Sequence, residues 1–386
     1  CFSCFGAKEK DTPAATQGKP ALHAPPTPSK GSGPAPPPKQ AEEEESEWKK
    51  QELSELPPDF ASKARSKPRI DVSENRIVTL TVDFSMFAST LKELDVNDNR
   101  LKSIPDSICS LVKLEIFHAY KNEIQSLPQA IGQLKSLKEI NVFNNKITEL
   151  PAGIGTLGAL TLLNVASNQL GKTPLPSFDG LTSLTRLALF WNKITALPAL
   201  NKLGALQELQ VHKNSLKEFP SLVGLGKLTS LQASDNRLES ITATIGSCAS
   251  LEELSVGKNN LLSLPLDLVK CKKLSKLVVN NNALTDFPAD LLLPSLQTLD
   301  LSHNQLTTLE NVGKIRELHN LFIQGNKIRT LGADVLGIKS LRRVNLEGNP
   351  LHGFTQEADL KRICDQNGGK FVGSQKDDAP AIVAKI

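Results

Sequence analysis

The stretch "LKELDVNDNRL" at residues 91–101 decides the fold, because it recurs along the chain as LxxLxLxxN followed by one more aliphatic residue. It returns as "LEELSVGKNNL" at 251–261 and as "LQTLDLSHNQL" at 296–306, and the first copy, "IDVSENRI" at 70–77, lacks the leading leucine. Intervals of 22 to 24 residues separate the asparagines Asn75, Asn99, Asn122, Asn145, Asn168, Asn192, Asn214, Asn236, Asn259, Asn282, Asn304, Asn326 and Asn349. Thirteen copies at one period indicate a repeat protein.

Each copy predicts a short strand followed by a turn. Because side chains alternate along a strand, the leucines at the fourth and sixth positions face the core, and the third, fifth and seventh positions face outward. The asparagine at the ninth position lies at the turn, where its amide can bond backbone groups of neighbouring repeats. Many second halves read LPxxIxxL, as in "LPQAIGQLKS" at 127–136 and "LPAGIGTLGA" at 150–159. This spacing predicts a short helix or 3₁₀ turn that begins with proline.

The pattern resembles the leucine-rich repeat over roughly residues 68–352. The predicted fold class is therefore α/β: a curved leucine-rich repeat solenoid with a parallel β-sheet on its concave face and short helices or 3₁₀ turns on its convex face. The LPxxIxxL halves resemble the intracellular Ras-group family. The 22-residue repeats, such as the one containing "LENVGKIREL" at 309–318, resemble a type 1 phosphatase regulatory subunit. These resemblances imply partners in small-GTPase or phosphatase signalling.

The ends of the chain have a different composition. Residues 1–47 are rich in proline and end in the acidic run "EEEESE" at 42–47, so they bury too little apolar surface to fold and are predicted to be disordered. Residues 48–67 contain a partial repeat, "LSELPPDF", and are predicted to cap the first strand. Residues 353–386 are predicted to form a C-terminal cap and tail, with helical spacing at Leu360 and Ile363.

Composition narrows the function. The net charge of +4 on 386 residues is too small for a typical nucleic-acid binder. No sequence signature of a hydrolase, nucleotide-binding loop, kinase or metalloprotease is found, so we expect no catalytic residue, metal, cofactor or small-molecule substrate. The six cysteines make no paired zinc pattern. Cys248 and Cys271 stand where other repeats have leucine, which predicts buried thiols.

Aromatic residues single out one part of the predicted concave face. The only tyrosine, and the only tryptophan outside the N-terminal segment, fall at outward positions of nearby repeats. The predicted partner-binding residues are His118, Tyr120, Phe143, Arg186, Phe190, Trp191 and His212. Exposed rings are common anchors of protein interfaces. The alternative is that the rings stack on one another, at about 0.2–1 kcal/mol per pair. Further along, Ser234, Gly257 and Asn280 predict a smooth polar surface.

The N-terminal tail contains two proline motifs and two cysteines. "PPTPSK" and "PAPPPK" fit PxxPxK, which favours an SH3-type groove, against the alternative of a plain spacer. The ligand residues would be Pro25, Pro28, Lys30, Pro34, Pro37 and Lys39. Cys1 and Cys4 are candidates for lipidation if Met-Gly precedes them in the natural protein, which would give a doubly acylated anchor. The alternatives are a bacterial lipoprotein and a fragment boundary.

These observations together predict a non-enzymatic scaffold or adaptor that binds a protein partner on its concave face. We expect it in the cytoplasm, with peripheral tethering to the inner face of a membrane through its N-terminus. One alternative is a membrane-anchored lipoprotein or receptor-like recognition protein, and another is a regulatory subunit of an enzyme. An enzyme in its own right would need a catalytic domain, and only about 35 residues follow the last repeat.

Overall fold

The computed structural model describes residues 47–310, 312–351 and 355–374. The chain divides into two units, Cys1–Glu44 and Glu45–Ile386, and every described residue belongs to the second unit. The predicted disorder of the tail, the SH3-type ligand residues and the lipidation residues Cys1 and Cys4 therefore lie outside the described residues.

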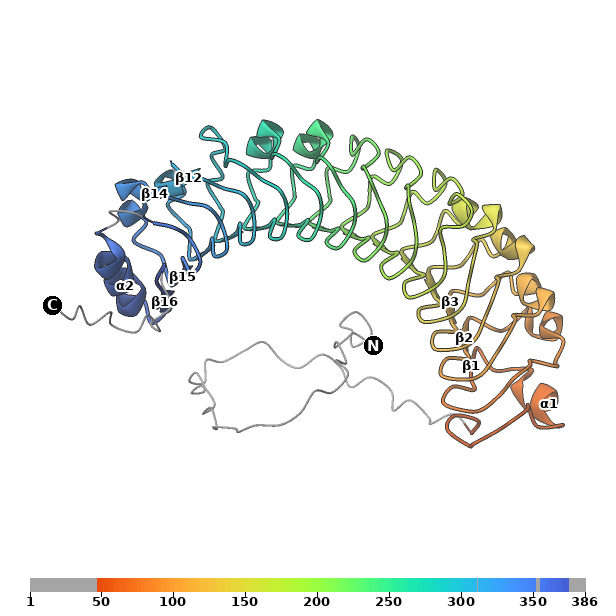
Figure 1. Ribbon diagram of the computed structural model, residues 1–386. Helices are drawn as coiled ribbons and strands as arrows, with labels where there is room; N and C mark the ends of the chain where they lie inside the picture. The colour runs from red at the N-terminus through yellow and green to blue at the C-terminus, as the bar shows by residue number, and fades with distance from the viewer. Residues whose placement is uncertain (1–46, 311, 352–354, 375–386) are drawn as a thin grey trace, which may run out of the picture. The chain divides into compact units, whose positions relative to one another are not determined.

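Short parallel strands line the inner side of an arc of stacked repeats (Figure 1). Fourteen of the described strands form one sheet in chain order. They are β1 (Arg69–Asp71), β2 (Glu93–Asp95), β3 (Ile116–His118), β4 (Glu139–Asn141), β5 (Leu162–Asn164), β6 (Arg186–Ala188), β7 (Glu208–Gln210), β8 (Ser230–Gln232), β9 (Glu253–Ser255), β10 (Lys276–Val278), β11 (Thr298–Asp300), β13 (Asn320–Phe322), β15 (Arg343–Asn345) and β16 (Lys370–Val372). A separate pair joins β12 (Thr308–Leu309) to β14 (Thr330–Leu331).

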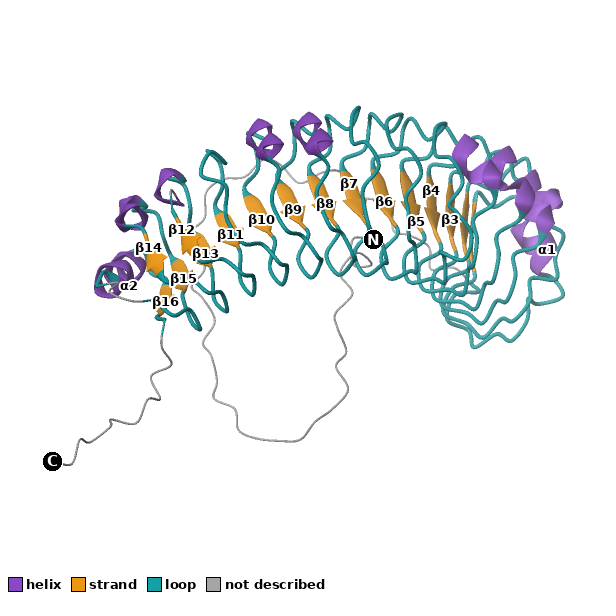
Figure 2. Cartoon of the chain, turned by 45° about the horizontal axis from the view of Figure 1, so that its top comes forward, coloured by secondary structure: helices purple, strands orange, loops and turns teal. Residues whose placement is uncertain are grey.

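Each repeat strand holds only the third, fourth and fifth positions of its repeat. The fourth-position residue is buried, as Leu94 and Leu187 are, and the equivalent residues of neighbouring strands pair in register. The predicted parallel sheet on the concave face is therefore confirmed (Figure 2). The sequence had suggested that the seventh and eighth positions, which include Phe190 and Trp191, lie on the strand. In the structure they lie beyond its end.

The convex side carries 3₁₀ turns, and the five-residue turns among them follow the length of the repeat. They are η2 (Phe84–Phe87), η3 (Asp106–Ser110), η4 (Gln129–Gln133), η5 (Ala152–Thr156), η6 (Ala243–Ser247), η7 (Leu266–Lys270), η8 (Val312–Lys314) and η9 (Ala333–Gly337). All six five-residue turns fall in the repeats whose asparagines are 23 residues apart. Residues 157–242, which are all described and span a 24-residue and two 22-residue repeats, contain no helix. A 3₁₀ turn advances only about 2 Å per residue, so a 22-residue repeat must cross the convex side with less of it: η8, in such a repeat, has three residues.

The ninth-position asparagine ties each repeat to the preceding one, as the pattern predicts. The Asn99 Oδ1 atom accepts a hydrogen bond from the Ile77 N–H at 2.9 Å. Its Nδ2 group donates to the Val72 carbonyl at 2.9 Å and to the Val96 carbonyl at 3.2 Å. The equivalent bonds recur at all thirteen asparagines. These bonds satisfy buried backbone groups that the short strands leave unpaired.

The residue before each asparagine adopts the left-handed backbone conformation. The thirteen φ values lie between +49° and +70°. We call these eighth-position residues the rim: Glu74, Asp98, Lys121, Asn144, Ser167, Trp191, Lys213, Asp235, Lys258, Asn281, His303, Gly325 and Gly348. This conformation costs an ordinary L-residue about 1–2 kcal/mol, and Asn, Asp and Gly tolerate it best. Trp191 is the bulkiest residue of the rim.

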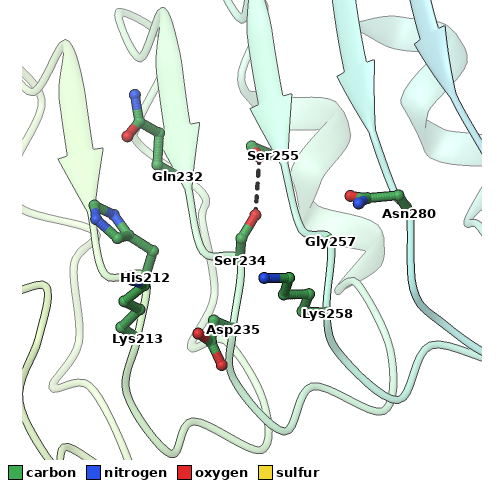
Figure 3. Close-up of a pocket in the computed structure, with 9 residues that line it drawn as sticks. All are labelled: His212, Lys213, Gln232, Ser234, Asp235, Ser255, Gly257, Lys258 and Asn280. Atoms are coloured by element: carbon green, nitrogen blue, oxygen red, sulfur yellow. Dashed lines mark hydrogen bonds between the residues drawn. The ribbon is translucent and has the colours of Figure 1, made fainter. Parts of the chain in front are cut away.

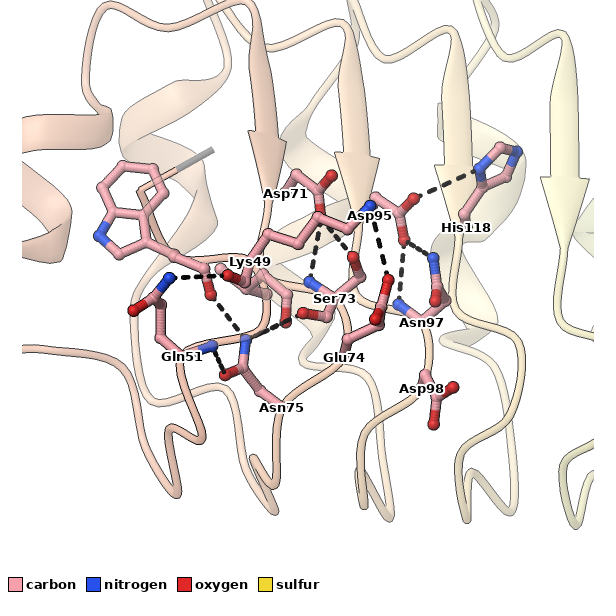
Figure 4. Close-up of polar contacts among 12 residues, drawn as sticks. Lys49, Gln51, Asp71, Ser73, Glu74, Asn75, Asp95, Asn97, Asp98 and His118 are labelled. Atoms are coloured by element: carbon pink, nitrogen blue, oxygen red, sulfur yellow. Dashed lines mark hydrogen bonds and ion pairs between the residues drawn. The ribbon is translucent and has the colours of Figure 1, made fainter. Parts of the chain in front are cut away.

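The N-terminal segment completes the hydrogen bonds of the first repeat. The Trp48 carbonyl accepts a bond from the Asn75 Nδ2 group at 2.7 Å, and the N–H groups of Gln51 and Leu53 donate to Asn75 Oδ1 at 2.9 Å (Figure 4). The Trp48 ring packs against Phe60 of α1 (Phe60–Ala64), with the ring centroids 4.7 Å apart. Residues 48–64 therefore occupy the place of a preceding repeat.

The last repeat is covered by a helix and one more strand. Helix α2 (Glu357–Gln366) buries Leu360, Ile363 and Cys364, at the spacing that the sequence predicts. Strand β16 then extends the sheet beyond β15, which the sequence did not indicate. Among the described residues, no helix is both long and apolar enough to cross a membrane.

Candidate functional site

Phe190, expected to face water, is buried. Only 3% of its surface is exposed, so the expectation that it is an open anchor is wrong. Its ring stacks on the imidazole of His212, with centroids 4.5 Å apart and planes within 8°. On its other side it meets Phe143, with centroids 6.2 Å apart. The alternative of rings stacked across strands is therefore correct for Phe190.

A small residue explains how these rings meet. Phe143 and Phe190 lie two repeats apart, and two strand spacings amount to about 10 Å. The seventh position between them is Ala166, which is completely buried. Because its methyl group leaves space, the two phenylalanine rings lean toward each other over it. We call Phe143, Phe190 and His212 the ring stack.

Trp191 is the exposed aromatic residue of this region. Its exposed fraction is 44%, and its φ is +54°. The ammonium group of Lys213, the next rim residue, lies 4.5 Å from the centroid of the indole ring. This cation–π contact fixes one side of the ring and leaves the rest of it accessible.

His118 and Tyr120 form a second, more polar group. Their rings contact each other, with centroids 6.3 Å apart. His118 also lies between two carboxylates. Its Nδ1 atom is 3.8 Å from Asp95 (Figure 4), and its Nε2 atom is 3.7 Å from Glu139. Burial lowers the pKa of His118, but the two carboxylates raise it more, to about 9. The imidazole is therefore charged at neutral pH.

His212 has the opposite electrostatic character. Burial, with a smaller contribution from the charge of Lys213, lowers its pKa to about 4, so the ring is neutral at pH 7. Its Nδ1 atom is buried and has no hydrogen-bond partner among the described residues, and the same is true of Asn164 Nδ2 on β5 and Gln210 Oε1 on β7. Arg186, the remaining predicted residue, begins β6 and is half-buried.

A hollow interrupts the surface that the sequence had suggested would be smooth. Its volume is about 310 Å³. It is lined by His212, Lys213, Gln232, Ser234, Asp235, Ser255, Gly257, Lys258 and Asn280 (Figure 3). Gly257 is the only glycine at a seventh position of the thirteen repeats. This absence of a side chain is the feature of the sequence from which the hollow could have been predicted.

Cysteines and metal ligands give no reactive centre in the described part of the chain. Cys109, Cys248, Cys271 and Cys364 are buried free thiols, which confirms the prediction for Cys248 and Cys271. Burial raises the pKa of Cys248 to about 12 and that of Cys271 and Cys364 to about 11, which disfavours the nucleophilic thiolate. No group of three His, Cys, Asp or Glu side chains among the described residues is arranged to hold a metal ion.

Comparison with known proteins supports the repeat assignment. The family "Leucine rich repeat" matches residues 89–147 and 135–194, and "Leucine Rich repeats (2 copies)" matches residues 272–314 and 294–336. The septation initiation network scaffold protein cdc11 of Schizosaccharomyces pombe is 35% identical over 63 residues. That match covers 16% of this chain and 6% of cdc11, so this chain matches only a small part of its curated relative.

Solved structures share the architecture. The leucine-rich repeat protein LIC12759 of Leptospira interrogans superposes with a TM-score of 0.66 at 23% identity, over 84% of this chain and 94% of LIC12759. The PEPR1–AtPEP1 structure gives a TM-score of 0.68 at 28% identity, over 78% of this chain and 44% of the matched chain. The repeat pattern, the family matches and these superpositions show that the chain is built of leucine-rich repeats and has the leucine-rich repeat fold.

Proposed function

We propose that this chain is a non-enzymatic scaffold that binds a protein partner on its concave face and rim, with Trp191 as the central anchor. The observation that carries the proposal is the indole of Trp191, exposed to 44% on a left-handed backbone.

The fold gives no reason for a tryptophan at this turn. Twelve other rim residues form the same turn, and most of them are polar or glycine. A bulky side chain there carries the conformational cost of the left-handed region and exposes apolar surface to water. Local strain at an exposed side chain is typical of binding sites. A partner that covers the indole would remove this apolar surface from water and so offset the cost of exposing it.

The surroundings of Trp191 suit a preorganised contact. Lys213 holds one face of the indole, and Phe190, its neighbour in the chain, is fixed within the ring stack. The asparagine bonds on both sides hold the backbone of the turn. Little side-chain or backbone freedom is then left to lose on binding, which favours affinity.

The partner class is a further part of the proposal. The resemblance of the LPxxIxxL halves to the Ras-group family, and of the 22-residue repeats to a phosphatase regulatory subunit, favours a signalling protein such as a small GTPase or a phosphatase in the cytoplasm. The relative cdc11 is named a scaffold protein, which also supports this class.

Affinity capture with a matched pair of variants tests the proposal. Trp191→Asn removes the indole and keeps a residue suited to the turn. Ser167→Asn makes the same change of backbone preference at the preceding rim position, where φ is +53°. We expect quantitative mass spectrometry to find partners that are enriched on the wild-type chain and on Ser167→Asn and lost on Trp191→Asn. Equal capture by all three chains would refute Trp191 as the anchor.

A further inference from the structure

We propose that the hollow beside Gly257 is a subsite for an anionic oxygen group, a carboxylate or a phosphate ester, on a peptide segment of the partner. This inference rests on the proposed function, because it takes the same partner to be anchored at Trp191.

The hollow exists because one side chain is missing. A Cβ atom added to Gly257 would overlap the Oδ1 atom of Asn280, whose side chain leans over the glycine (Figure 3). The seventh positions on either side, Ser234 and Asn280, keep their side chains. The space between them, about 310 Å³, is large enough for the end of one acidic side chain.

The charged groups around the hollow favour an anion. Lys213 and Lys258 line it, and Asp235 is the only acidic residue that does so. Within the described part of the chain, Lys258 makes no ion pair, and Figure 3 shows its ammonium group extending toward Ser234 over the hollow. The neighbouring His212 is neutral at pH 7, because burial holds its pKa near 4. The lining therefore carries one net positive charge.

Neutral donors complete the lining. The hydroxyl groups of Ser234 and Ser255 are 2.9 Å apart and share one hydrogen bond. Since each hydroxyl has one proton, the pair keeps a second proton that it can donate to a ligand. The side-chain amides of Gln232 and Asn280 stand on opposite sides and add N–H donors (Figure 3). Ammonium, hydroxyl and amide donors around one space are the groups that bind carboxylate and phosphate oxygens.

Lys213 joins the hollow to the indole, and the geometry sets a spacing. Lys213 lines the hollow and also contacts Trp191. The repeat of Trp191 lies two to three strands before the centre of the hollow. The distance between the indole and the hollow is therefore about 10–14 Å. An extended peptide advances about 3.3 Å per residue. The acidic residue of the partner should therefore follow or precede the residue on Trp191 by about three to four positions.

Oriented peptide libraries test this subsite with the full chain. Three libraries of random peptides differ only at a fixed central residue: glutamate, phosphoserine or glutamine. We expect the wild-type chain to enrich the glutamate or the phosphoserine library over the glutamine library, and the stronger of the two identifies the source of the anion. Selected peptides are then labelled with a fluorophore and titrated by fluorescence anisotropy, a readout that the wild type and Trp191→Asn share.

Two variants separate this subsite from a general effect of charge. Lys258→Asn removes one cation, and Lys121→Asn removes a cation at an equivalent rim position, where φ is +52° against +53°. We expect Lys258→Asn to weaken acidic peptides at least about fivefold, equivalent to ~1 kcal/mol, and Lys121→Asn to leave them unchanged. Gly257→Ala, which narrows the hollow beside Asn280 without changing charge, should weaken the same peptides.

Two results would overturn the subsite: no preference for either acidic library over glutamine, or the same affinity for acidic peptides in the wild type and in Lys258→Asn. A failure of the proposed function would look different. Acidic peptides would then still depend on Lys258 and Gly257, and Trp191→Asn would bind them as tightly as the wild type does.

Discussion

The imidazole of His212 lies flat against the ring of Phe190, 4.5 Å between centroids, and this contact turns a predicted binding residue into a structural one. Stacking covers both rings. It accounts for the exposed fraction of 3% at Phe190 and contributes to the burial that keeps His212 neutral. The adjacent Trp191 takes no part in this stack and remains open.

Phe190→Ala should therefore destabilise the chain. Loss of a buried phenylalanine ring costs about 3–5 kcal/mol in a core, and a site at the edge of the sheet should lie near or below the lower value. The variant also uncovers His212, so we expect the pKa of His212 to rise from about 4 toward its ordinary value. Urea unfolding measures the first effect, and the NMR titration of the imidazole measures the second. Unchanged stability and an unchanged His212 pKa would show that the stack does not form in solution.

Trp191→Asn should have the opposite effect on the fold. Asparagine suits the left-handed conformation, so the substitution relieves part of a cost of about 1–2 kcal/mol. It also removes the cation–π contact with Lys213, worth about 0.5–1 kcal/mol at an exposed site. We expect the free energy of unfolding to stay equal or to rise by up to about 1 kcal/mol. A fall of more than about 1 kcal/mol in urea unfolding would mean that the indole supports the fold.

His118 should make stability depend on pH in the alkaline range. Its pKa is raised to about 9 in the fold, above the ordinary 6.5. A raised pKa means that the ion pairs with Asp95 and Glu139 contribute fully below pH 6.5 and are lost as the pH rises through about 9. We expect wild type to lose about 1–3 kcal/mol more than His118→Gln between those values. Unfolding curves at pH 6.5 and 10 measure the difference, with the exposed His303→Gln as the control. Parallel losses in wild type and His118→Gln would contradict the pairing.

Asn145→Ala should lower stability by about 2–4 kcal/mol, because a buried backbone group loses its partner. The Ile124 N–H donates to Asn145 Oδ1 at 2.9 Å and has no other acceptor among the described residues. The Ala119 carbonyl loses one bond but keeps another, from the Asn122 amide. The control is Asn260→Ala at an exposed position one residue after a ninth-position asparagine. Equal denaturation midpoints for the two variants would rule out the asparagine ladder as a major source of stability.

Much of the fold could be read from the repeat alone. The period, the strand register, the inward leucines and the asparagine bonds are consequences of side-chain alternation and of the donors and acceptors of an amide, so each follows from local sequence. The interval between asparagines also separates the repeats with a five-residue 3₁₀ turn from the others.

The candidate site could be predicted only in part. The pattern predicted outward-facing side chains at these positions, and the structure leaves Tyr120, Phe143 and both histidines partly exposed and Trp191 exposed. The pattern did not show that Phe190 is buried and Trp191 is exposed. It also gave no indication of Lys258 or of the hollow at Gly257.

The tertiary structure decided these points because they depend on contacts between repeats. Whether Phe190 is exposed depends on Phe143 and His212, which lie 47 residues before it and 22 residues after it in the sequence, and on the small size of Ala166 between them. Whether Trp191 is exposed depends on Lys213 of the next repeat, which covers one side of the indole and leaves 44% of the residue exposed. The sequence by itself determined the repeating unit and the face of each residue. Packing between neighbouring units decided which residues of that face a partner can reach, because exposure is a property of neighbouring atoms and not of a position in the repeat.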